Sequence, residues 1–270
     1  MKTTYTKIIS ICLVVVALGL VLWFTRKSPN DSLPRETTEP YNEGSSTTSI
    51  PMEKDTSVPQ GLKDTETKNK GDTLPLAPDL SKPIIIKAQL TEAVREENIA
   101  KVKEFQNMLT SNPSYYDGWL MLGIYRKELG DYDGAAEAWL YASKLQPNRY
   151  VAYNNLGDLY HIDLKNFPLA EKNMLEAIRL KPDYIQGYMN LYDLYVYSYK
   201  EKSDKADDIL KTGLAKNPDG INLAISLGKY YLEAGDNTSA RIYYDKAIAI
   251  AKSQNNSALA DELAKESKGI

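Results

Sequence analysis

The sequence predicts an all-α fold of helix-turn-helix repeats, preceded by one transmembrane helix and a disordered linker. Three observations lead to this prediction: an uncharged run near the N-terminus, a proline-rich stretch after it, and a residue pattern that recurs about every 35 residues in the second half. A chain of 270 residues holds one or two domains by the usual size of domains. The uneven composition indicates one structured domain, residues 83–270.

Residues 1–27 are expected to form an N-terminal transmembrane anchor. Ile8 to Phe24 is uncharged, is flanked by basic residues, and would span roughly 25 Å as a helix, close to the thickness of a bilayer core. Trp23 lies at the end of the run, where interfacial aromatic residues belong. The alternative is a cleaved signal peptide, but its apolar core is usually shorter and ends in small residues.

We therefore expect a single-pass membrane protein that is held in the membrane through residues 8–24. The basic residues on the two sides of this run differ little, and they slightly favour a cytoplasmic N-terminus. The repeat domain is accordingly expected on the extracytoplasmic side.

Residues 28–82 are expected to be a disordered linker. They contain seven of the thirteen prolines, ten acidic and six basic residues, and no apolar periodicity. Such a segment cannot bury enough apolar surface to offset the chain entropy lost on folding. A flexible chain of this length has an end-to-end distance of roughly 40 Å, so we expect a spacer between anchor and domain.

Four successive units share one pattern: Leu-Gly, an alanine about twelve residues later, another seven later, and a proline five later. Each unit is predicted to hold two helices, because an apolar stripe at helical spacing precedes a turn, and a second helix then runs to a proline that stops it. The turn is Gly-Asp in the first and fourth units. The units cover 116–149, 150–184, 185–220 and 221–254.

Glycines recur inside the first predicted helix of three units, as Gly123, Gly157 and Gly228. Glycine inside a helix costs up to about 1 kcal/mol relative to alanine, so its recurrence predicts a packing reason. A large side chain there would push the paired helices beyond the usual 8–10 Å.

Both ends of the array are expected to be covered, as stacked repeats require. Residues 84–115 look like a diverged helix pair that covers the first repeat, and 256–267 like a capping helix at the C-terminal end.

The pattern resembles the tetratricopeptide repeat (TPR) family, as the second unit illustrates with Leu156, Gly157, Tyr160, Ala170 and Pro182. The resemblance covers 116–254. It implies a right-handed α-solenoid whose inner groove, lined by the first helix of each unit, holds an extended peptide or a partner's helix. The third unit departs from the pattern, with Tyr192 in place of glycine and Gly213 in place of alanine.

By position, the resemblance places eleven residues in this groove. They are Leu120, Met121, Ile124, Asn154, Asn155, Asp158, His161, Gln186, Met189, Asn190 and Asp193. Asn155 and Asn190 stand where peptide-binding members hold a ligand's backbone amide through donor and acceptor; asparagine is also simply frequent at that position. Leu120 and Ile124 replace the lysine and asparagine of a carboxylate clamp, so binding of a chaperone tail is not expected.

Tyrosine is unusually frequent, with 20 Tyr against 3 Phe and 3 Trp. Most of these tyrosines stand at signature positions of the repeat, which predicts a role in packing. The exceptions suggest a second contact surface at Tyr192, Tyr197 and Tyr199, since tyrosine is enriched at protein interfaces.

Composition excludes several functions. A net charge of -3 makes nucleic acid an unlikely partner. One cysteine and one histidine leave no disulfide framework and no metal site, and no cofactor motif is present. With His161 as the only imidazole, no Ser-His or Cys-His pair is expected to meet, so the chain is not predicted to be an enzyme.

The sequence thus predicts a membrane-anchored scaffold whose groove binds a peptide or helix of another protein and organises a membrane or envelope assembly. The alternative is a structural protein that forms homo-oligomers through the third repeat and its tyrosines. A third hypothesis is an accessory domain of an enzyme on another chain.

Overall fold

The computed structural model describes residues 74–270, and this part of the chain is all-helical. The predicted anchor and the predicted linker up to residue 73 lie outside the described residues. Among residues 74–270, no helix combines the length and apolar character needed to cross a bilayer.

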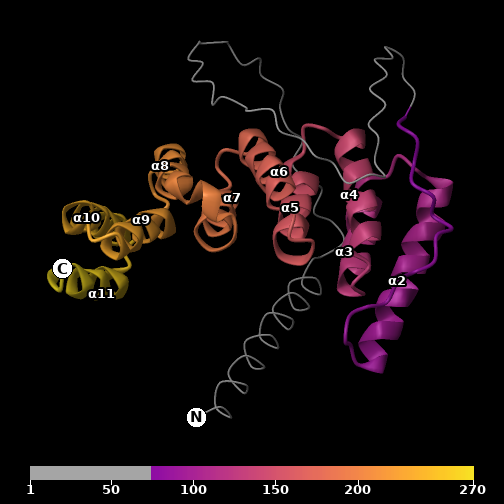
Figure 1. Cartoon of the computed structure of the whole chain (residues 1–270), viewed down its shortest axis with the longest axis horizontal. Helices are drawn as coiled ribbons and strands as arrows, with labels where there is room; N and C mark the ends of the chain where they lie inside the picture. Colours follow the sequence, from indigo (N-terminus) through magenta and orange to yellow (C-terminus); the bar gives the residue numbers. More distant parts are fainter. Residues whose placement is uncertain (1–73) are drawn as a thin grey trace. The chain divides into compact units, whose positions relative to one another are not determined.

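Ten α-helices follow one another in the described part of the chain (Figure 1). Two π-helical segments and one 3₁₀ segment interrupt them. The α-helices are α2 (Glu92–Ser111), α3 (Tyr116–Glu128), α4 (Tyr132–Leu145), α5 (Tyr150–Asp158), α6 (Phe167–Leu180), α7 (Ile185–Asp193), α8 (Ala206–Lys216), α9 (Ile221–Glu233), α10 (Asn237–Ser253) and α11 (Ser257–Lys268). The other segments are η1 (Leu159–Asp163), η2 (Leu194–Ser198) and η3 (Lys200–Lys205).

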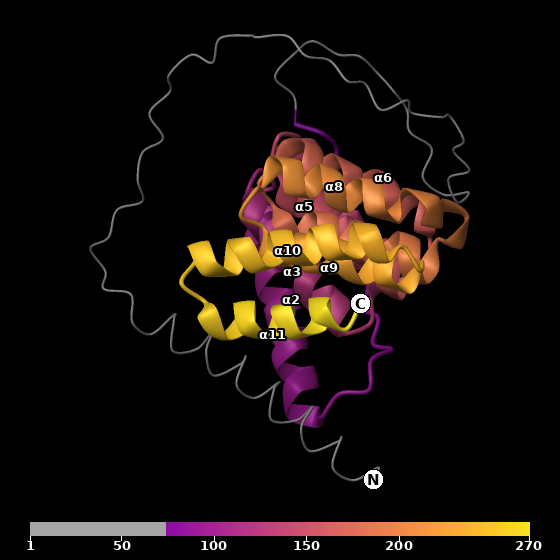
Figure 2. The ribbon, with the colours of Figure 1, turned by 90° about the vertical axis from the view of Figure 1, so that its left-hand side faces the viewer.

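The helices pack in four consecutive pairs, α3 with α4, α5 with α6, α7 with α8, and α9 with α10. Each pair also contacts the next helix along the chain, so the core is continuous from pair to pair. At the C-terminal end α11 lies along α10 (Figure 2). The third pair is in less extensive contact than the other three, because α8 begins only after η3.

The packing reason predicted for the recurrent glycines is confirmed. A Cβ on Gly123 would lie 2.2 Å from the indole nitrogen of Trp139. On Gly157 it would lie 2.7 Å from Met174 Cγ, a residue of the paired helix. In the third unit the glycine lies on the second helix and the large side chain on the first. The ring of Tyr188 on α7 fills the space over Gly213 on α8, at 2.7 Å from the position of a Cβ there.

The Gly-Asp turns of the first and fourth units differ from the turn of the second unit. Gly130 and Gly235 both have φ of 78°, a backbone conformation that favours glycine. Asp131 follows Gly130, caps α4 by accepting a hydrogen bond from Gly134 N, and forms a buried ion pair with Arg126. The second unit has no glycine here.

In the second unit Lys165 takes the left-handed conformation, with φ of 53°, and Asn166 caps α6. This unit has 35 residues and the third has 36, against 34 in the others. Each first helix of the longer units ends in a π-turn, closed by Leu164 N to Leu159 O at 2.9 Å and by Tyr199 N to Leu194 O at 2.7 Å. A π-turn adds one residue to a helix without breaking it, so it accounts for the extra residue of the second unit and for one of the two extra residues of the third.

The prediction of a helix pair over 84–115 is wrong. One helix, α2, covers 92–111, and residues 84–91 form no helix. Pro83 and the β-branched run after it disfavour a helix, and the amides of Lys87 and Ala88 donate to Leu129 O at the end of α3, at 2.9 and 3.1 Å.

The prediction of disorder is also wrong for residues 74–82, which lie against the helices. Tyr141 donates its hydroxyl hydrogen to Pro75 O at 3.2 Å, and the Gln106 amide donates to Leu80 O at 2.7 Å. Lys82 pairs with Glu137 on α4. Apolar contact of Leu80 with the core supports the same placement.

Candidate partner-binding groove

The predicted groove residues of the second and third repeats form a connected row of polar side chains. Gln186 donates a hydrogen bond from its amide to Asn190 Oδ1 at 2.7 Å within α7. Asn190 in turn approaches Asp158 Oδ1 on α5, with its amide nitrogen at 3.4 Å. The asparagine predicted to hold a ligand amide therefore stands in contact with the neighbouring repeat.

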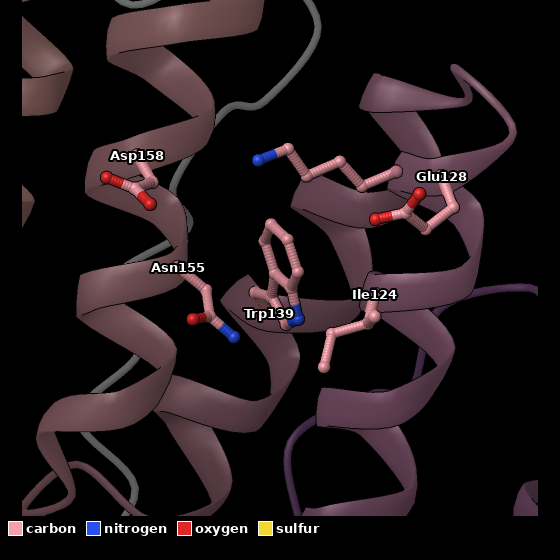
Figure 3. A pocket seen from close by; sticks show the side chains of 6 residues that line it. Ile124, Glu128, Trp139, Asn155 and Asp158 are labelled. Carbon is pink, nitrogen blue, oxygen red and sulfur yellow. The ribbon is translucent and has the colours of Figure 1, made fainter. Parts of the chain in front are cut away.

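A small pocket of about 160 Å³ lies between the first and second repeats. Trp139 stands between Ile124 and Glu128 on one side and Asn155 and Asp158 on the other (Figure 3). Lys127 also lines it. Three predicted groove residues thus meet around one indole ring, which is itself buried, and the exposed side chain of Ile124 offers an apolar surface beside the amide and carboxylate groups.

Two aspartates of the predicted groove are partly desolvated. Burial raises the pKa of Asp158, while the nearby Lys127 opposes this effect. Burial also raises the pKa of Asp193, opposed by His161. Lys127 forms its ion pair with Asp163, at 3.4 Å, rather than with either of these carboxylates. No described ion pair involves Asp158 or Asp193, so both leave acceptor capacity at the groove.

His161 is placed differently from the prediction. It is only 7% exposed, and its Nε2 lies 2.8 Å from Ser198 Oγ, which joins η1 to η2 across two repeats. The expectation that no serine meets the single histidine is therefore wrong. The two π-turns bring these residues together although they are 37 positions apart. Burial lowers the pKa of His161, and Lys165 lowers it further.

Leu120 is also not a groove side chain, because it is 9% exposed and belongs to the core, with its carbonyl accepting the Trp139 indole hydrogen at 3.0 Å. Ile124 remains exposed. The residues of intermediate burial are Met121, Asn154, Asn155, Asp158, Met189, Asn190 and Asp193. Ser226 Oγ on α9 lies 3.8 Å from Met189 Sδ, which extends the groove toward the fourth repeat.

The three tyrosines of the predicted second contact surface do not share one exposed face. Tyr197 is 66% exposed, whereas Tyr192 is 7% exposed and packs against Tyr230 with ring centroids 6.4 Å apart. Tyr199 is half-buried and lies beside Phe167, with 6.1 Å between their centroids. Tyr192 stands where the other units have glycine, and its ring is buried against Tyr230 on α9 of the fourth repeat.

Lys127, Glu128, Trp139 and Ser198 contribute to the groove or its support but were not predicted to do so. Trp139 stands at a packing position of the repeat. It also lines the pocket because it lies next to the gap between the first and second units. Within residues 74–270, no three His, Cys, Asp or Glu side chains converge in the way a metal ion would need.

The comparisons with known proteins agree with this arrangement of helices. Residues 120–185 and 195–256 match the profile of the tetratricopeptide repeat family. These two matched segments, somewhat less than half of the chain, fall within the four helix pairs and are recognised as TPR repeats. No curated protein sequence gives a significant match.

Solved structures with a similar course of the chain are known. The crystal structure of MamA is 21% identical, with a TM-score of 0.49 over 63% of this chain and 99% of that one. The structure of pilF from Pseudomonas aeruginosa is 18% identical, with a TM-score of 0.45 over 65% of this chain and 89% of that one. YrrB, described as a TPR protein with an unusual peptide-binding site, is 17% identical, with a TM-score of 0.45 over 64% of this chain and 86% of that one.

Proposed function

We propose that this chain is a membrane-anchored scaffold whose TPR groove binds a peptide or helix of a partner protein, and so organises a membrane or envelope assembly. One observation carries the proposal: the row Gln186, Asn190 and Asp158 runs beside the pocket at Trp139. Amide and carboxylate groups next to the exposed side chain of Ile124 provide hydrogen bonds for a backbone and apolar contact for side chains.

The membrane part of the proposal rests on the sequence. The uncharged run of residues 8–24 would anchor the chain in one pass, and the repeats would stack as a right-handed solenoid on the extracytoplasmic side. Protease added to intact cells tests the side: cleavage within 84–270 is expected, and full protection would contradict the orientation.

Site-specific photo-crosslinking tests the groove. A crosslinker at Asn155, which borders the pocket, should trap a heterologous protein in membranes, and Asn190→Ala should weaken that product. The same crosslinker at Asp261, an exposed position on α11, is the control. Equal products from both positions, or self-crosslinks alone, would argue against binding in the groove.

A second candidate function is self-association through the third repeat. The exposed ring of Tyr197 favours it, since tyrosine contributes contact area at low entropy cost. Sedimentation of the purified chain should then show mass increasing with concentration, and Tyr197→Ser should reduce the effect. A monomer at every concentration would refute this alternative.

A further inference from the structure

Residues 75–82 form a strap that contains no helix and lies across α2 and α4. Two side chains hold this strap by its backbone. Tyr141 of α4 donates its hydroxyl hydrogen to Pro75 O at 3.2 Å, and Gln106 of α2 donates an amide hydrogen to Leu80 O at 2.7 Å. Side chains from two helices therefore bind two carbonyl oxygens of one segment of the chain.

The strap also makes contacts through its side chains. Ala77 and Leu80 pack against the hydrophobic core, and Lys82 forms an ion pair with Glu137 of α4. Hydrogen bonds to the backbone, combined with apolar and ionic contacts of side chains, are the means by which proteins recognise peptides. We call Gln106, Glu137 and Tyr141 the strap site, because each of them binds the strap.

The face of α4 that binds the strap differs from the same face in the later units. Tyr141 stands one residue before the second recurring alanine of its unit, and the corresponding residues of the later units are Glu176, Thr212 and Lys246. Tyr141 is 3% exposed, whereas Thr212 and Lys246 are exposed. Its ring packs edge-on against Trp119, with centroids 4.6 Å apart, and its hydroxyl binds the strap. Among the four units, only the first therefore offers a tyrosine hydroxyl to a peptide carbonyl at this position.

The strap is held weakly. None of its residues is buried, and Leu76 is 98% exposed. Within residues 74–270, no backbone–backbone hydrogen bond joins the strap to a helix, and its ion pair is partly exposed, so that pair contributes little. The amides of Lys87 and Ala88, in contrast, both donate to Leu129 O. The strap can therefore leave its site while residues 87–88 stay bound at the end of α3.

We propose that the strap site is a second peptide-binding surface, and that the strap is its resident ligand, which a segment of a partner protein displaces. The partner segment has the chemistry of the strap: it is rich in proline and leucine, forms no helix, and carries a lysine two residues after a leucine. The chain's own strap competes at high effective concentration, so it keeps the surface closed at low partner concentration. The inference goes beyond the proposed function, because α4 is the second helix of its unit and the groove is lined by first helices.

The test uses the purified full chain and a fluorescein-labelled peptide with the sequence of residues 74–84. A released chain carries Leu80→Asp and Lys82→Glu, which remove the apolar and ionic contacts of its own strap. Fluorescence anisotropy should show saturable binding of the peptide to the released chain, about tenfold tighter than to the wild type. A peptide with the same two changes should not bind. Absence of saturable binding to the released chain, or equal binding to both chains, would overturn the proposal.

Variants made in the released chain locate the surface. Tyr141→Phe keeps the ring but removes the hydroxyl, and Glu137→Gln removes the partner of the lysine; each should weaken binding of the peptide about threefold. The matched control is Glu176→Gln, which removes a carboxylate at the corresponding position of the second unit, and its affinity should equal that of the released chain. Equal weakening by the control and the site variants would overturn the proposal.

Sedimentation distinguishes a partner protein from a second copy of this chain. The wild-type and released chains should have the same mass at each concentration. A wild-type dimer that the two strap substitutions abolish would show that a second copy supplies the strap, and would overturn the assignment to a partner.

The outcome is separable from that of the proposed function. A heterologous crosslink at Asn155, together with a released chain that does not bind the peptide, removes this inference alone. Peptide binding that depends on Glu137 and Tyr141, without any heterologous crosslink at Asn155, supports the strap site and removes the proposed groove.

Discussion

The close approach of Gly123 to Trp139 makes a sharp test of how the paired helices pack. In Gly123→Ala the new methyl group would lie 2.2 Å from the indole nitrogen and 2.5 Å from the adjoining ring carbon of Trp139. The indole is buried and donates to Leu120 O at 3.0 Å, so it cannot move aside without losing that hydrogen bond.

Three contributions set the magnitude. Overpacking a core costs about 1–3 kcal/mol, and losing a buried hydrogen bond adds about 1 kcal/mol. Replacing glycine by alanine inside a helix returns about 1 kcal/mol. The free energy of unfolding should therefore fall by about 1–3 kcal/mol, which corresponds to a drop in melting temperature of about 2–12 °C for a domain of this size.

Urea unfolding of the two proteins, followed by circular dichroism and by tryptophan fluorescence, measures the change. Gly228→Ala is the matched control, because its methyl group would lie 3.0 Å from the nearest atoms of the Tyr244 ring, so a small shift suffices. The Gly123 variant should lose clearly more stability than the Gly228 variant. A Gly123→Ala protein as stable as the wild type, with unchanged tryptophan emission, would refute the packing argument.

Three further predictions concern stability. Asp131→Asn keeps the cap of α4 but leaves the Arg126 guanidinium buried without its counter-charge, so the free energy of unfolding should fall by about 3–5 kcal/mol in urea titrations. The double variant Arg126→Met with Asp131→Leu should recover much of this lost stability. Folding lowers the pKa of His161, so the unfolded chain takes up a proton at a higher pH than the folded chain does. The free energy of unfolding should therefore fall as the pH drops below about 6.5. The difference in urea midpoint between pH 7.5 and pH 5.5 should therefore shrink in His161→Asn, and an unchanged difference would contradict this. Asn256→Ala removes the cap on Leu259 N and should destabilise α11 by about 1 kcal/mol, seen as faster amide hydrogen exchange confined to that helix.

Much of the helical pattern was predictable, because it depends on contacts close in sequence. Pro147, Pro182 and Pro218 follow the ends of α4, α6 and α8, as the stop signals indicate. The predicted capping helix over 256–267 differs by one residue at each end from α11. The segment before α2 was mispredicted, since its placement depends on hydrogen bonds to Leu129, which lies far along the chain.

The candidate groove was predictable only as a list of positions. Repeat position alone brought Ile124, Asn155 and Asp158 to the pocket, but it also selected Leu120 and His161, which are buried. Position within a helix indicates which side faces the groove. It does not indicate how far a neighbouring repeat covers that side.

The amino-acid sequence by itself determined the repeat, the length of each unit and the need for glycine between paired helices, because these follow from helix periodicity and local sterics. Only the tertiary structure decided that the first helices of the second and third units end in π-turns, that His161 meets Ser198, and that Tyr192 is buried against Tyr230. These features depend on the rotation and distance between helices more than 30 residues apart, which the packing of whole repeats sets.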